Sequence, residues 1–452
     1  MARKFRRVDY TESLQQTVML ADCLAPEHLA RFIVGIIGLL DVSQIYACYA
    51  PLGGEAFAPE VLLGVLFYGY ATGVFSSRKL ETATYLSIPF RFIAGGLHPD
   101  HDTIATFRKT FLAEIGDLFT QVLVVAHELG VFKLGNISVD GSKIHADASK
   151  SRAVSYGHLP ELEQRLRSEV DTLLAVGEHA DQSGLPEGPD VTDEIRRRRD
   201  QLLNLSMVKA ILEARAQERF EAEQAEYEAK MREREAITRE TGHRPRSHAP
   251  ARPCPGPREN DQYNFTDPDS RIMKNSTNAG FDQHYNAQVA VDQASLLIVG
   301  NALSNHPNDK AEALPTVKAI PTELGQPPAA ALDNGYYSPK TIAALEAQGI
   351  EPYIATGREP HHQSWLDRLA KQPTPLPADA SPIVKMAYKL RTEIGQAIYR
   401  LRKCTVEPVI GIVKEVLGFR QFSLRGQGAA AGEWCLVCLA FNLKRLHTLI
   451  TQ

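Results

Sequence analysis

Near the C-terminus, apolar residues recur at the three- and four-residue spacing that is typical of an amphipathic helix. The apolar positions are Val406, Val409, Ile410, Val413 and Leu417. Glu407 and Lys414 are seven residues apart, close to two helical turns, so both lie on one edge of this stripe. Thr405 is the predicted N-cap, which puts Pro408 in the first turn, where its missing N–H costs little. Taken alone, a glutamate in this position is more typical of a solvated or capping residue.

Helix signals also dominate the start of the chain. Helices are predicted over about 26–40, 59–72, from Ser76 onward, and as one long helix to about Leu129 after His98. These elements predict an all-α N-terminal domain over residues 1–133. Such a domain suits DNA binding and equally suits packing or dimerisation, and no clean helix-turn-helix spacing decides between the two.

Alternation of apolar and polar residues then predicts strands. They cover about 135–147, 284–292, 296–303, 329–333 and 350–355. Asp140 lies in the middle of the first strand and Asp333 at the end of the fourth. A buried acid is costly unless it binds a cation, although Asp140 at a strand end paired with Lys143 is an equally good explanation. The order of elements predicts an α/β fold, a mixed sheet with flanking helices. If the first and fourth strands are neighbours, Asp140 and Asp333 meet, and the last helix brings Glu407.

The composition changes abruptly between the first strand and the second. From Tyr156 the sequence is charged and helix-favouring, and a proline-rich tract follows from Pro245 to Pro257. This pattern predicts a helical, coiled-coil-like insertion over 156–279, with a catalytic domain formed by 134–155 and 280–452. The run Arg196 to Arg199 is interpreted as a solvated helix face rather than a DNA contact.

Composition and charge narrow the class of protein. The chain has 452 residues, 44% of them hydrophobic, and a net charge of -4, which excludes a uniformly basic nucleic-acid binder. From Lys385 to His447, however, eleven Lys and Arg face four Asp and Glu, so a local positive surface is available. Cys435 and Cys438 are interpreted as core thiols rather than zinc ligands. With neither a signal-peptide pattern nor a membrane-spanning run, a soluble cytoplasmic protein is expected.

Three carboxylates that converge from different elements predict a hard, oxygen-rich site, which suits Mg²⁺ or Mn²⁺ better than zinc. Two such ions about 3.5–4 Å apart activate a water or a 3′-hydroxyl and stabilise the leaving oxygen of a phosphodiester. Lys414, Arg402 and Lys403 are predicted to hold the phosphate backbone. This constellation indicates phosphoryl transfer on a nucleic acid.

At several motifs the chain resembles the DDE transposases of bacterial insertion sequences. The matching stretches are 99–108 in the N-terminal helices, Val139 to Lys143, Asp333 to Tyr336, Val406 to Lys414, and Phe419 to Gly426. One branch of that family carries a Tyr, Arg, Glu, Lys signature with two, three and six residues between them. Here Tyr399, Arg402, Glu407 and Lys414 keep the first and last gaps, but four residues separate Arg402 from Glu407. Lys403 is therefore an alternative for the arginine position.

The resemblance implies a ribonuclease-H-like catalytic core with Asp140, Asp333 and Glu407 as catalytic residues and metal ligands. It further implies Mg²⁺, with Mn²⁺ as a substitute and two ions per site, and DNA contacts by Lys414, Arg402, Lys403, Tyr399 and Arg425. The implied function is cut-and-paste transposition by a homodimer in a synaptic complex on double-stranded DNA, at terminal inverted repeats and target DNA. The expected location is the cytoplasm, at the nucleoid, without membrane association.

Two other functions fit the same fold. One is a DNA-binding regulator or host factor that has lost cleavage, although such a protein has no reason to retain mutually repelling buried carboxylates. The other is a ribonuclease-H-like nuclease that hydrolyses without strand transfer. The helical N-terminal domain and the insertion favour an assembly-forming transposase over the nuclease.

Overall fold

The computed structural model describes residues 19–49, 56–183, 191–241, 243, 248–275, 280–357 and 380–451. These residues form two compact units. The sheet unit comprises Met1–Asp147, Met273–Gly280 and His284–Gln452, and the hairpin unit comprises Ala148–Ile272 and Phe281–Gln283. The N-terminal helices and the strands of the predicted catalytic domain therefore belong to one unit, which also holds Asp140, Asp333 and Glu407.

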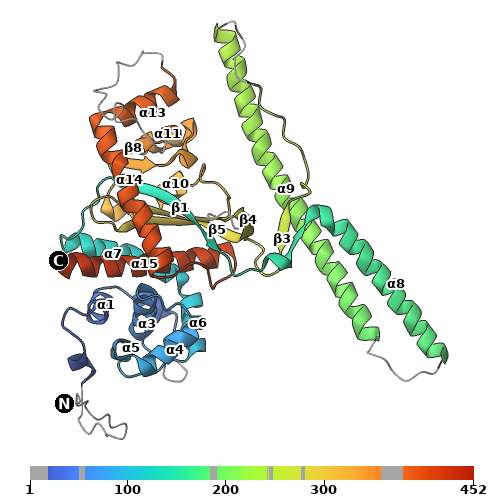
Figure 1. The fold of residues 1–452 in the computed structure, drawn as a ribbon, viewed down its shortest axis with the longest axis horizontal. Helices are drawn as coiled ribbons and strands as arrows, with labels where there is room; N and C mark the ends of the chain where they lie inside the picture. Colours follow the sequence, from blue (N-terminus) through green and yellow to red (C-terminus); the bar gives the residue numbers. More distant parts are fainter. Residues whose placement is uncertain are drawn as a thin grey trace, which may run out of the picture. The chain divides into compact units, whose positions relative to one another are not determined.

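A mixed six-stranded sheet forms the centre of the sheet unit (Figure 1). Its strands are β1 (Ile137–His145), β4 (Arg271–Lys274), β5 (Phe281–Asp292), β6 (Ile298–Ser304), β7 (Ala329–Leu332) and β8 (Glu351–Ile354). Their order is β4-β5-β1-β7-β8, with β6 also paired to β5. The neighbours β5 and β1 are antiparallel, whereas β1, β7 and β8 run parallel. The prediction that the first and fourth predicted strands are neighbours is confirmed by the β1–β7 pairing.

The N-terminal part of the sheet unit is helical. Its α-helices are α1 (Leu29–Ile37), α2 (Ser43–Ala47), α3 (Pro59–Ala71), α4 (Ser77–Leu86), α5 (Ile88–Ile93), α6 (His101–Thr110) and α7 (Leu112–Glu128). The helix expected to reach about Leu129 is α7, and the stretch that leads into it forms the separate helix α6, with a bend of 74° between the two. Phe107 and Phe111 are buried at this bend, with ring centroids 4.8 Å apart. These two rings therefore pack against each other where α6 and α7 meet.

The C-terminal part of the sheet unit supplies the remaining helices. They are α10 (Ala313–Lys318), α11 (Pro339–Glu346), α13 (Pro382–Arg391), α14 (Glu393–Gly411) and α15 (Gln427–Thr451). Ser338 caps α11, since its hydroxyl accepts a hydrogen bond from the Thr341 N–H at 3.0 Å. The start predicted for the Glu407 helix is wrong. Helix α14 begins at Glu393, and its cap is Thr392, whose hydroxyl accepts from the Gly395 N–H.

Thr405 and Pro408 consequently lie inside α14 rather than at its start. The Thr405 hydroxyl lies within hydrogen-bonding distance of two acceptors, the Leu401 carbonyl oxygen at 2.7 Å and the Ser138 hydroxyl on β1 at 2.8 Å. Burial of Thr405, Val406 and Val409 accompanies this contact. Tertiary packing thus outweighs the backbone hydrogen bond that a proline removes from a helix. After Gly411 the helix continues as a single π turn, Ile412–Val416, a feature that often occurs at functional sites.

A buried carboxylate joins the N-terminal helices to α15. Glu433 of α15 is fully buried and accepts hydrogen bonds from the Tyr70 hydroxyl at 3.0 Å and from the backbone N–H groups of Ser423 and Leu424 at 2.8 and 3.0 Å. The Arg108 guanidinium lies 3.8 Å from the carboxylate and donates to the same Tyr70 oxygen at 2.8 Å. The N-terminal helices and the C-terminal helix therefore share one polar core.

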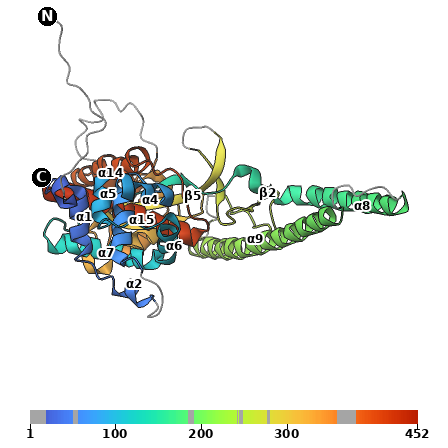
Figure 2. The ribbon, with the colours of Figure 1, turned by 90° about the horizontal axis from the view of Figure 1, so that it is seen from below.

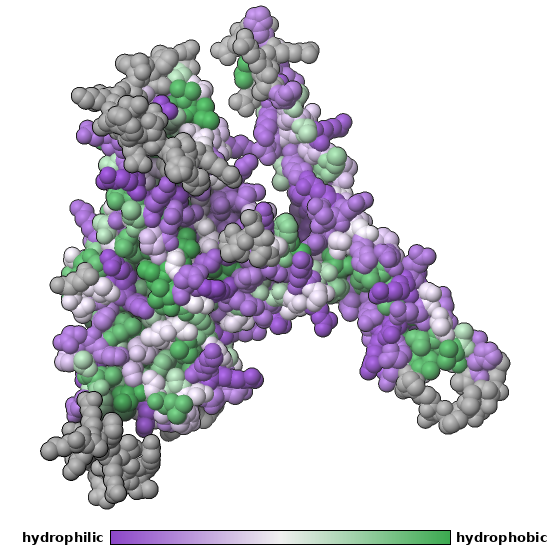
Figure 3. Space-filling model, viewed as in Figure 1, coloured by the Kyte–Doolittle hydropathy of each residue, from purple (hydrophilic) through white to green (hydrophobic). Residues whose placement is uncertain are grey.

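The hairpin unit contains two long helices that run side by side, α8 (Leu159–Ser183) and α9 (Val191–Thr241) (Figures 1 and 2). A two-stranded sheet of β2 (Ala153–Ser155) and β3 (Gln262–Asn264) accompanies them. A small apolar core lies at their base, formed by Val154, Leu159, Leu166, Leu205, Val208 and Leu212. The described surface of α9 is predominantly hydrophilic (Figure 3). In the four-arginine run, Arg196 to Arg198 form ion pairs with Asp193, Glu194 and Glu169.

The remaining predictions concern segments outside the described residues, the cysteines of α15 and membrane-spanning helices. The basic residues from Arg3 to Arg7, and the histidines His361 and His362 in a segment that the sequence predicts to be a polar loop, lie outside the described residues. Cys438 is buried in α15, and burial raises the pKa of the neighbouring Cys435 thiol to about 11. Within the described ranges, no single helix is both long and apolar enough to cross a membrane, and only the bent pair α6 and α7 passes that test when taken together.

Candidate active site

One face of β1 carries polar side chains that contact α14 and the π turn that follows it. Because side chains alternate along a strand, Ser138, Asp140 and Ser142 point to the same face. Ser138 contacts Thr405, Asp140 contacts Arg402, and Ser142 accepts a hydrogen bond from the Lys414 ammonium at 3.0 Å. Helix α14 and the π turn that follows it therefore cover the polar face of β1, and Asp140 lies at its centre.

Asp140, inside β1, and Asp333, directly after β7, come together on two neighbouring strands. In the parallel pairing of β1 with β7, Val139 lies opposite Leu332, and each aspartate follows its paired residue directly. Burial raises the pKa of Asp140 to about 6, and the negative charges of Asp333 and Asp309 add to this rise. The Arg402 guanidinium and the Gly141 N–H act in the opposite direction on the same pKa. The two aspartates are thus close enough for the charge of Asp333 to raise the pKa of Asp140.

Arg402 connects Asp140 to Glu407. Its two terminal nitrogens lie 2.9 Å from Asp140 Oδ2 and 3.1 Å from Glu407 Oε1. The side chain is only 9% exposed, whereas Glu407 is about half exposed. Arg402 Nε is buried and has no hydrogen-bond partner among the described residues. Asp140 therefore pairs with Arg402 rather than with Lys143, which donates to the Lys274 carbonyl.

The other predicted phosphate-binding residues lie around this site in different environments. Lys414 is half-buried, and burial lowers the pKa of its ammonium group while it donates toward Ser142 and the Lys143 carbonyl. Tyr399 is partly buried and Lys403 is exposed on α14. Arg425 is exposed and forms an ion pair of 2.8 Å with Asp147. Of the predicted cations, Arg402 and Lys414 make the direct contacts to the polar face of β1.

Four residues that sequence reasoning did not select complete the surroundings of the two aspartates. Asp309 accepts hydrogen bonds from the side-chain amides of Asn286 and Gln288, both at 2.8 Å. The hydroxyl group of Tyr336, three residues after Asp333, donates a hydrogen bond to Gln288 Oε1. A polar residue at every second position of β5 was the available signal, since Asn286 and Gln288 alternate with apolar residues.

Two family models match the chain. The first, a transposase domain (DUF772), matches residues 18–110, and the second, a transposase DDE domain, matches residues 379–447. Both matches support an insertion-sequence DDE transposase. No curated protein and no solved structure matches the chain.

The matched ranges divide the site of this transposase. Arg402, Glu407 and Lys414 lie inside the DDE match, together with Tyr399, Lys403 and Arg425, whereas Asp140 and Asp333 lie between the two matched ranges. A DDE transposase domain implies, in general, an enzyme that acts on DNA and cleaves it. The confirmed part of the resemblance is therefore the class of enzyme, and the two aspartates depend on the geometry described above.

DDE transposases generally use a divalent metal. The donor chemistry of the site suits such an ion, because Asp140, Asp309 and Asp333 are hard oxygen donors whose charges act on one another. Within the described residues, no group of three or more His, Cys, Asp or Glu side chains is arranged to hold a metal ion. Arg402 instead supplies the positive charge between Asp140 and Glu407. The carboxylates are therefore suitable donors for a divalent metal, and in this structure Arg402 balances the negative charge of Asp140 and Glu407.

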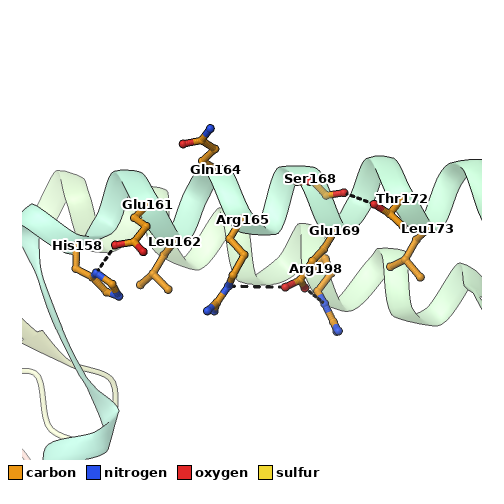
Figure 4. Close-up of a pocket in the computed structure, with 10 residues that line it drawn as sticks. All are labelled: His158, Glu161, Leu162, Gln164, Arg165, Ser168, Glu169, Thr172, Leu173 and Arg198. Carbon is orange, nitrogen blue, oxygen red and sulfur yellow. Dashed lines mark hydrogen bonds and ion pairs between the residues drawn. The ribbon is translucent and has the colours of Figure 1, made fainter.

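A separate hollow lies in the hairpin unit of the transposase, along α8 (Figure 4). Its charged side chains are engaged with one another: His158 with Glu161, and Glu169 with both Arg165 and Arg198. It contains none of the residues that surround Asp140. These surface ion pairs explain its polarity, and each contributes little to stability.

Replacing Gly141 by alanine is expected to disrupt the site. A Cβ at this position would lie 2.0 Å from Gln288 Nε2 and 3.0 Å from Asp309 Oδ1. Gln288 cannot simply rotate away, because Asn286, Asp309 and Tyr336 all hold its amide. Overpacking of this kind costs about 1–3 kcal/mol. Chemical denaturation measures the change in the free energy of unfolding.

The matched control for this substitution is Gly116→Ala in α7, where nothing lies within 4 Å of the added Cβ. Helix propensity predicts that this variant is as stable as wild type or slightly more so. A Gly141→Ala protein with wild-type stability would show that Gln288 is not held in the way described.

Proposed function

We propose that this transposase moves its element by cut-and-paste transposition. It binds the terminal inverted repeats, hydrolyses the phosphodiester at each end, and joins the freed 3′-hydroxyl to target DNA. Asp140, Asp333 and Glu407 are the catalytic carboxylates of a ribonuclease-H-like core, formed by 134–155 and 280–452. The observation that carries this proposal is the parallel register of β1 and β7, which makes Asp140 and Asp333 neighbours, with Glu407 linked to Asp140 through Arg402.

In this proposal the three carboxylates hold Mg²⁺, or Mn²⁺ as a substitute, as two ions per site. When bound, the ions supply activation of the attacking oxygen and stabilisation of the leaving oxygen. The chain's own residues do the remaining work. Lys414, which donates a hydrogen bond to Ser142, and Arg402 are proposed to donate to phosphate oxygens. Arg402 must then exchange part of its carboxylate contact for the substrate.

Further DNA contacts are proposed on the exposed side of the same segment. Lys403 and Arg425 are exposed, and Tyr399 lies one helical turn before Lys403 on α14. Such contacts position the DNA without reading its sequence. The N-terminal helices up to residue 133 are proposed to serve DNA binding and assembly in a homodimeric synaptic complex.

Excision of a marker flanked by the DNA ends that border this gene tests the proposal. Purified wild-type protein is expected to release the marker in Mg²⁺ and not in EDTA. Glu407→Gln is expected to bind the same ends while cleavage falls by about 10³-fold or more, because several kcal/mol of transition-state stabilisation are lost. Glu415→Gln is the matched control, since Glu415 is exposed on the following π turn and forms its ion pair with Arg420.

The outcomes separate the candidate functions. Release by wild type and by Glu415→Gln, but not by Glu407→Gln, supports the three-carboxylate transposase. If all three proteins bind the ends and none cuts in Mg²⁺ or Mn²⁺, the protein is a DNA-binding regulator in which Arg402 permanently neutralises the carboxylates. If Glu407→Gln cuts as well as wild type, Glu407 is not part of the site.

A further inference from the structure

A fourth carboxylate lies beside the two aspartates of the proposed site. Asp309 is located in the segment between β6 and α10 and is partly exposed. Its Oδ1 atom accepts two hydrogen bonds of 2.8 Å, one from Asn286 Nδ2 and one from Gln288 Nε2. Two donors on a single oxygen fix the direction of the carboxylate, so its charge is held in one place.

The two amides that hold Asp309 are themselves rigid. Asn286 and Gln288 lie two residues apart on β5, so they share one face of the strand, and both are buried. Gln288 Nε2 also donates to Asn286 Oδ1 at 3.0 Å, and Gln288 Oε1 accepts from the buried Tyr336 hydroxyl. This network, which we term the amide clamp, consists of Asn286, Gln288 and Tyr336. A fully satisfied buried polar network of this kind specifies one arrangement.

The amide clamp holds Asp309 close to the backbone beside each aspartate, on the face of β1 opposite to the Asp140 side chain. A Cβ added at Gly141, next to Asp140, would lie 3.0 Å from Asp309 Oδ1. A Cβ added at Gly335, two residues after Asp333, would lie 3.4 Å from Asp309 Oδ2. The two oxygens of one carboxylate thus approach the backbone beside each predicted acid. The charge of Asp309 also contributes to the raised pKa of Asp140.

We propose that Asp309 is a positioning residue of the transposase site, where its clamped carboxylate adds a fixed negative charge that strengthens cation binding at Asp140 and Asp333. This inference rests on the proposed function, because it assumes that the two aspartates bind a divalent cation. Asp309 acts through the field at these neighbours and need not touch the ion. Its role is comparable to that of the residues behind metal ligands, whose loss typically weakens metal binding by about 10- to 100-fold.

Mn²⁺ binding to the full-length protein without DNA, followed by electron paramagnetic resonance, tests the inference. Asp309→Asn keeps an oxygen that can accept from Asn286 and Gln288, and it removes only the charge. Its affinity for Mn²⁺ is expected to fall by about 10- to 100-fold. Its melting temperature in EDTA should stay at or above that of wild type, because a repulsive charge beside Asp140 has been removed. A loss of the clamp would instead lower the melting temperature.

Two further variants make the result decisive. Glu346→Gln, at an exposed position of α11, removes a carboxylate of the same unit and should leave Mn²⁺ affinity unchanged. Asp140→Asn tests the site itself. If Asp140→Asn loses Mn²⁺ binding and Asp309→Asn binds like wild type, the inference about Asp309 is overturned while the proposed function stands. If wild type and Asp140→Asn bind Mn²⁺ equally, the proposed metal site fails, and the inference fails with it.

Discussion

Asp140→Asn is expected to abolish excision and, at the same time, to stabilise the metal-free protein. Loss of this carboxylate removes a proposed metal ligand, so cleavage should fall by about 10³-fold or more. The stability gain follows from burial, which raises the pKa of Asp140 to about 6 from an ordinary value of 3.8. A rise of that size favours the protonated over the ionised carboxyl by about 3 kcal/mol.

The sign of the effect depends on pH. A carboxyl whose pKa is higher in the folded state than in the unfolded state makes its full contribution to stability below pH 4. That contribution is lost as the pH rises to about 6, because the folded protein must then hold an ionised group that burial disfavours. Asparagine avoids this loss. In EDTA, wild type and Asp140→Asn should therefore unfold alike near pH 4 and differ by up to about 3 kcal/mol above pH 6.

Denaturation at several pH values in EDTA, together with the excision assay, checks both parts. Asp117→Asn is the control, because Asp117 is exposed on α7. It should change neither the activity nor the pH dependence of stability. An Asp140→Asn protein that is less stable than wild type at pH 8 would mean that the ion pair with Arg402 outweighs the burial of the carboxylate.

Glu433→Ala is expected to give the largest loss of stability of any variant considered. Glu433 is fully buried and is the acceptor for the Tyr70 hydroxyl and for the Ser423 and Leu424 N–H groups. Its removal leaves these donors unsatisfied and leaves the buried Arg108 without its carboxylate. Removing one partner of a buried pair costs about 3–5 kcal/mol. The free energy of unfolding by urea measures the loss.

Glu433→Gln separates charge from hydrogen bonding. It keeps one acceptor oxygen but removes the charge that faces Arg108, so a loss between zero and that of Glu433→Ala is expected. An exposed control is Glu415→Gln, whose ion pair with Arg420 is worth less than about 1 kcal/mol. If Glu433→Ala unfolds with wild-type stability, the shared polar core does not hold the N-terminal helices against α15.

The strands that carry the two aspartates were predictable because each has a recognisable pattern within its own short stretch of sequence. Alternation around Asp140 and the apolar run that ends at Asp333 are short local patterns, and the order of elements allowed β1 and β7 to be neighbours, as they are in the structure. The start of α14 was not predictable in the same way. Thr405 and Pro408 form a good local start signal, yet the contacts of Thr405 and Arg402 with β1 keep the helix continuous from Glu393.

By itself, the sequence determined which residue types lie where: the alternating strands, the two long charged helices, and the acids Asp140, Asp333 and Glu407 with their motif spacing. Only the tertiary structure decided which charges meet. It placed Arg402 between Asp140 and Glu407, brought Asp309 to the same site through Asn286 and Gln288, and buried Glu433 against Tyr70. The physical reason is range. Periodicity reports the environment of neighbouring residues, whereas these contacts join positions up to 363 residues apart, and their strength comes from burial that no local pattern encodes.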